Sequence, residues 1–73
     1  MTTPHERDGA LAAVERIVNR GSCDVVAETL ALLRRLYADV ELGADGSIVA
    51  AGATEDDAPF LRRVAVLISA HLP

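Results

Sequence analysis

Residues 25–51, VVAETLALLRRLYADVELGADGSIVAA, decide the fold class, because the spacing of apolar residues changes within this stretch. Over residues 25–37 apolar side chains recur three or four positions apart, as they do along one side of a helix. From Asp39 onward apolar and other residues alternate, which is typical of strands. We therefore predict a helix that includes residues 25–37 and is followed by a β-hairpin. The helix carries two neighbouring apolar rows: Val26, Leu30, Leu33 and Tyr37, and beside them Val25, Leu32 and Leu36.

The predicted hairpin turns at residues 43–46, whose Asp-Gly pair is a strong turn signal. A loop of two or four residues places Val40, Leu42, Val49 and Ala51 on one face of the hairpin. The opposite face then carries Glu41, Ile48 and Ala50. A loop of three residues would exchange the faces of the second strand, because side chains alternate along a strand. We expect the first of these two registers.

The segment before residue 25 predicts another helix with signals at both ends. Residues 3–6, TPHE, place a Thr N-cap, a proline at the first helical position and a Glu that closes a capping box. Gly9 weakens the first turns, and Gly21 is a stop signal. Ser22 then suits the N-cap of the second helix, with Asp24 in its first turn. We expect residues 1–8 to be the loosest part of the chain.

A third helix follows the hairpin and closes the chain. Proline is tolerated only in the first turn of a helix, so Pro59 makes Asp56 or Asp57 the predicted N-cap. The acidic run 55–57 lacks the spaced oxygen ligands of a calcium loop, so we interpret it as capping. The residues expected on one side of this helix are Phe60, Val64, Leu67, Ile68 and His71. The predicted fold is a single α+β domain over residues 1–73, ordered helix-helix-hairpin-helix.

Composition limits the function classes. The chain has 73 residues and is 51% hydrophobic, but 13 residues are alanine and the only aromatic residues are Tyr37 and Phe60. A domain this small buries only about 60% of its unfolded surface, so we expect it to borrow surface from a partner. A net charge of −4 with scattered arginines argues against nucleic-acid binding. The sequence contains no apolar run of the ~20 residues that a membrane-spanning helix needs, so we predict no membrane span. The polar start without a signal-peptide core predicts a cytoplasmic protein.

Few residues here are typical of catalysis. Cys23 is the only cysteine, so an intrachain disulfide is excluded. A position near a helix start would favour its thiolate, whereas neighbouring Asp24 opposes it. We therefore keep Cys23 as a candidate reactive thiol and prefer a small, half-buried residue. The imidazoles of His5 and His71 lie near opposite ends of the chain. We predict no catalytic residues, no metal ligands and no cofactor, and therefore a protein that is not an enzyme.

The pattern of elements resembles a shortened GAF domain. Residues 25–37 are similar to the long amphipathic helix that opens this family, and residues 40–51 to the hairpin that follows it. Residues 59–72, PFLRRVAVLISAHL, are similar to its closing helix. A full GAF domain is roughly twice as long, and the segment that walls its ligand pocket has no counterpart here. The resemblance implies a dimerisation or scaffold function, and no pocket residue is carried over.

Surplus apolar surface predicts self-association. A two-stranded hairpin is marginal alone and leaves two open edges, and the apolar side of the second helix is wider than one contact requires. We expect a symmetric homodimer, formed either by joining two hairpins into a four-stranded sheet or by packing helices across a two-fold axis. The alternative is a monomer in which the first and third helices cover this surface. The candidate interface residues are Val25, Leu32, Leu36, Ile48 and Ala50. The predicted function is a protein-interaction or regulatory module. The alternative is a small-molecule sensor with a pocket between protomers.

Overall fold

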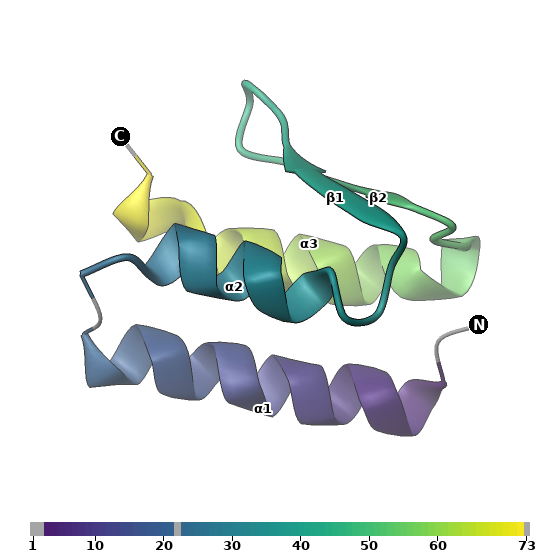
Figure 1. The fold of residues 1–73 in the computed structure, drawn as a ribbon, viewed down its shortest axis with the longest axis horizontal. Coiled ribbons are helices and arrows are strands. Elements are labelled where there is room, and N and C mark those ends of the chain that lie inside the picture. Colours follow the sequence, from purple (N-terminus) through teal and green to yellow (C-terminus); the bar gives the residue numbers. More distant parts are fainter. Residues whose placement is uncertain (1–2, 22, 73) are drawn as a thin grey trace.

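The computed structural model describes residues 3–21 and 23–72. Its helices are α1 (Pro4–Arg20), α2 (Val25–Leu33) and α3 (Ala58–Ile68), and its strands are β1 (Asp39–Leu42) and β2 (Ile48–Ala51). Two 3-10 turns flank α3: η1 (Glu55–Asp57) precedes it and η2 (Ser69–His71) follows it. The predicted α+β class and the order helix-helix-hairpin-helix are confirmed (Figure 1).

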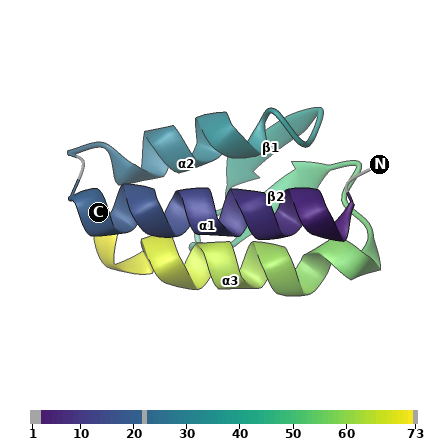
Figure 2. The same ribbon diagram turned by 90° about the horizontal axis from the view of Figure 1, so that it is seen from below.

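The helices and the hairpin form layers around one core. Helix α1 runs between α2 and α3 on one side, and the hairpin lies on the opposite side (Figures 1 and 2). Strand β1 contacts α2, and β2 contacts α3. The buried apolar residues come from α1, α2, β1, α3 and the turn after α2: Ala10, Val14, Val25, Leu33, Tyr37, Val40, Phe60, Leu61, Val64 and Ile68.

The ends of α1 are those that the sequence predicts. The Thr3 hydroxyl accepts a hydrogen bond from the Glu6 backbone N–H at 3.1 Å, and the Glu6 carboxylate accepts one from the Thr3 N–H at 3.3 Å. Gly21 ends the helix at φ 71°, in the left-handed region that favours glycine. The helix continues through Gly9 without a break. Its caps therefore follow from local sequence alone.

Helix α2 is shorter than predicted. The expected N-cap, Ser22, lies outside the described residues, and the N-cap position is held by Asp24. The helix ends at Leu33 rather than at Tyr37. Its last turn tightens, because the Leu36 N–H as well as the Tyr37 N–H donates to the Leu33 carbonyl. Tyr37 is nevertheless buried, as its apolar row predicts.

The buried side of α2 also differs from the predicted rows. Val25, Thr29 and Leu33, spaced four residues apart, point into the core, whereas Val26 and Leu30 are only half-buried. Thr29 is 0% exposed, and its hydroxyl has no hydrogen-bond partner among the described residues. A polar residue therefore occupies the centre of the helix face that contacts α1 and β1.

The predicted hairpin register is wrong. Val40 pairs with Ala50 and Leu42 with Ile48, so Val40, Leu42, Ile48 and Ala50 share the face that packs on the core. The other face carries Val49, which is 60% exposed. The cause is a loop of odd length, residues 43–47, between the last paired residues.

Hydrogen bonds within the loop fix this odd length. The Gly43 N–H donates to the Ser47 carbonyl at 2.7 Å. The Asp45 carboxylate accepts from the Ser47 N–H at 3.1 Å and from its hydroxyl at 2.6 Å. These bonds lower the pKa of Asp45 below its usual value, the hydroxyl contributing most.

The start of α3 agrees with the prediction, and its end does not. Asp57 holds the N-cap position, Pro59 lies in the first turn, and Phe60, Val64 and Ile68 are buried. His71 is exposed rather than aligned with this apolar row. The helix gives way to the 3-10 turn η2 after Ile68, and none of the residues of η2 is buried.

Candidate functional site

The five predicted interface residues fall into three different environments. Val25 is buried in the core, and Ile48 and Ala50 lie on the inner face of the hairpin. Leu32 on α2 and Leu36 in the turn after it are half-buried, and both line an open groove between α2 and α1. The structure therefore places Leu32 and Leu36 together in the groove and separates them from the other three residues. The expectation that Ile48 and Ala50 face away from the core is wrong, because of the register.

We call this feature the α1–α2 groove. It consists of two hollows that adjoin at Leu32 and Arg35, which line both of them. At the end near the start of α1, the lining residues are Glu6, Gly9, Ala10, Leu32, Arg35 and Leu36. At the other end they are Ile17, Arg20, Glu28, Ala31, Leu32 and Arg35. The groove combines an apolar floor with charged residues at its margins.

Gly9 and Ala10 leave the groove open on the α1 side, because they fill little of the space beside Leu32 and Leu36. Apart from the neighbouring residues and the backbone of its own helix, a Cβ added at Gly9 would meet no atom within 4 Å. The backbone at Gly9 is helical, so no left-handed conformation requires glycine there. A glycine inside a helix costs roughly 0.5–1 kcal/mol relative to alanine. Packing within the chain does not explain the residue.

The charges at the margins of the groove are only weakly engaged within the chain. Arg20 and Glu28 form an ion pair at 3.1 Å, with side chains 66% and 40% exposed. Pairs this exposed contribute little to stability, because water screens them. Arg35 is exposed and forms no ion pair within the part of the chain that the structure describes. These side chains can therefore re-pair at low cost.

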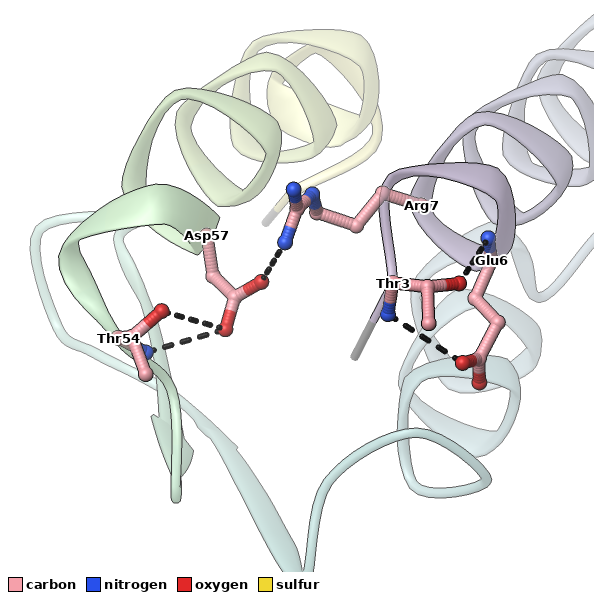
Figure 3. Close-up of polar contacts among 5 residues, drawn as sticks. All are labelled: Thr3, Glu6, Arg7, Thr54 and Asp57. Carbon is pink, nitrogen blue, oxygen red and sulfur yellow. Dashed lines mark hydrogen bonds and ion pairs between the residues drawn. The ribbon is translucent and has the colours of Figure 1, made fainter. Parts of the chain in front are cut away.

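A second polar cluster ties α1 to the start of α3. Arg7 and Asp57 form an ion pair at 2.7 Å, and their side chains are only 16% and 3% exposed (Figure 3). The other Asp57 oxygen accepts a hydrogen bond from the Thr54 N–H at 3.0 Å. The bond from Thr54 is the main cause that lowers the pKa of Asp57; burial opposes it, and Arg7 and the Tyr37 hydroxyl lower the pKa further. The cluster connects three segments and is a structural clamp.

The remaining predicted groups lie apart from the groove. Cys23 is exposed in the turn before α2, so the expectation of a half-buried residue is wrong. Whether its thiol is reactive stays a prediction. His5 and His71 are both exposed. Across residues 3–21 and 23–72, no three His, Cys, Asp or Glu side chains gather as metal ligands would.

Another apolar groove lies between β2 and α3 and was not predicted. Its lining residues are Ser47, Ile48, Ala58, Leu61, Arg62 and Ala65. It follows from the odd-length loop, which turns Ile48 toward α3. Gly9, Ile17 and Arg35 of the α1–α2 groove were also missed as site residues. The one available signal was a glycine within a helical pattern.

Comparisons of this chain with protein-family models, with curated proteins and with solved structures found no match. None of the helices in the described residues is both long enough and apolar enough to cross a membrane.

Proposed function

We propose that this protein is a non-enzymatic interaction module that works as a homodimer. The observation that carries the proposal is the α1–α2 groove, in which Leu32 and Leu36 remain partly open to solvent. In a domain of this size, covering such leucines in an assembly adds apolar burial that the single chain lacks. The resemblance to GAF domains supports the same proposal through their helical dimerisation role.

Sedimentation velocity over a range of micromolar concentrations tests the proposal. We expect a dimer that dissociates on dilution, and a 7.7 kDa monomer at all concentrations would contradict it. Leu32→Gln should shift the protein toward monomer, because it places an amide in the apolar floor. The matched control is Val66→Gln on α3, where Val66 is 62% exposed, and it should leave the dimer unchanged.

Joining two hairpins into a four-stranded sheet is the competing mode of assembly. Val49 is the large apolar residue on the outer hairpin face, so Val49→Asp tests this mode. Loss of the dimer in Val49→Asp but not in Leu32→Gln would move the interface to the hairpin. Ile48→Asp does not serve here, because Ile48 packs on the core and its substitution would destabilise the fold.

The sensor alternative rests on the β2–α3 groove, whose apolar lining includes one cation, Arg62. A ligand with an apolar body and an anionic group would suit that composition. Native mass spectrometry of freshly purified protein separates the two functions. A dimer mass without added mass supports the interaction module, and a retained small molecule supports the sensor.

A further inference from the structure

We infer that a second copy of this chain occupies the α1–α2 groove with its own α1 antiparallel, so that the partner's Ile17 packs over Gly9. This inference rests on the proposed homodimer and specifies its geometry. A two-fold axis makes the same surface patch serve both subunits, so the patch must be complementary to itself. The α1–α2 groove meets this requirement in charge and in shape.

The charge argument comes from a row of three residues on α1. Glu6, Ala13 and Arg20 are spaced seven residues apart, which keeps them on nearly the same side of the helix. Glu6 and Arg20 line opposite ends of the groove, and Ala13 is midway, about 10 Å from each by helical rise. A two-fold axis at Ala13 therefore places each Glu6 opposite the partner's Arg20. A parallel arrangement would oppose like charges instead.

The shape argument uses the same axis. Residues equally distant from Ala13 along α1 become opposite one another, and Gly9 and Ile17 are each four residues away. Gly9 has open space where a side chain would be, and Ile17 is half-buried with its side chain lining the groove. The partner's Ile17 then fills the space above Gly9, and the reverse contact forms on the other side of the axis. This packing explains a helix-interior glycine that the fold of one chain does not need.

Arg20 and Glu6 are available for such contacts. Among residues 3–21 and 23–72, Arg20 pairs only with Glu28 at the surface, and Glu6 takes part only in the exposed capping box with Thr3. Exposed pairs of this kind exchange partners readily. Arg35 lies at the centre of the groove margin and adds a cation that an acidic partner surface can approach.

Filling the space at Gly9 tests the packing. In Gly9→Leu the new side chain occupies the place of the partner's Ile17, and we expect the dimer dissociation constant to rise about tenfold or more, since overfilled contacts are costly. Leucine is a good helix former, so the fold of each chain should persist, which circular dichroism checks. The control is Ala70→Leu, which adds the same side chain at an exposed position outside the groove. An unchanged dissociation constant in Gly9→Leu would overturn the inference.

Cross-linking at the axis tests the geometry independently of stability. In a Cys23→Ser background, Ala13→Cys places the two thiols next to the two-fold axis, where they should oxidise to an intermolecular disulfide. Val66→Cys on α3 is the control and should not cross-link. A dimer in which Ala13→Cys fails to cross-link contradicts the antiparallel geometry and leaves the homodimer standing. A monomer in sedimentation contradicts the proposed function itself.

Discussion

Thr29 places a hydroxyl at the centre of the core, where a buried donor without a partner costs about 1–3 kcal/mol. Thr29→Val keeps the shape of the side chain and removes this hydroxyl. We therefore expect the free energy of unfolding to rise by about 1 kcal/mol, with the fold unchanged. Urea denaturation followed by circular dichroism measures the difference.

Thr54 offers the matched control for this substitution. Its side chain is exposed and caps η1 rather than lying in the core. Thr54→Val should lower the free energy of unfolding by about 1 kcal/mol, because it removes an N-cap. If Thr29→Val also destabilises the protein, then the Thr29 hydroxyl forms a hydrogen bond in solution, and the expectation for this substitution is wrong.

At the scale of elements, two ion pairs in this chain differ mainly in burial. Arg7–Asp57 joins α1 to the start of α3 and is nearly buried, whereas Arg20–Glu28 joins α1 to α2 at the surface. Asp57→Asn should lower the free energy of unfolding by about 1–3 kcal/mol, because Arg7 then loses its charged partner in a half-buried position. Glu28→Gln should change it by less than about 0.5 kcal/mol. Equal effects in urea denaturation would show that Asp57 is not a clamp.

The clamp also predicts a pH dependence. The pKa of Asp57 is lower in the folded protein than the ordinary value of 3.8, so the unfolded chain takes up its proton first as pH falls. The stabilisation is therefore complete above the unfolded pKa and is lost as pH falls from about 4 toward the folded pKa. We expect the free energy of unfolding to drop more steeply between pH 5 and pH 3 in the native protein than in Asp57→Asn. Parallel curves would exclude this contribution.

The elements also show which features local sequence can predict. The capping box of Thr3 and Glu6 involves neighbours in the chain, and the sequence predicts it. The hairpin register depends on whether the loop has an even or odd number of residues, and the Asp-Gly pair does not determine that number. The hydrogen bonds from Ser47 to Asp45 determine the number of loop residues, and these bonds form only once the loop is closed. Arg7 and Asp57 are 50 residues apart, so their pairing depends on tertiary packing.

For the whole molecule, the excess of apolar surface could be predicted from the sequence, but its location could not. Leu32 and Leu36 were predicted as interface candidates and do line the groove, whereas Val25 is needed for the core. The width of the apolar rows on a helix indicates how much apolar surface other elements or a partner must cover. Only the packing of α1 on α2 decides which part of that surface stays exposed to solvent. From the sequence, Gly9 was interpreted as a position that weakens the helix, whereas in the structure it lines one side of the groove.

Stability and association should respond in opposite directions to a change at Gly9. Only folded chains form the dimer, so a higher protein concentration favours the folded state and raises the melting temperature. The native protein should therefore melt at a higher temperature at ~100 μM than at ~1 μM. Gly9→Leu should melt higher than the native protein at the low concentration, because leucine improves helix propensity by somewhat less than about 1 kcal/mol. The melting temperature of Gly9→Leu should not depend on concentration, because the new side chain fills the groove.

Differential scanning calorimetry at both concentrations measures the melting temperature of each protein and its dependence on concentration. If the concentration dependence survives in Gly9→Leu, the interface lies on another face of the molecule.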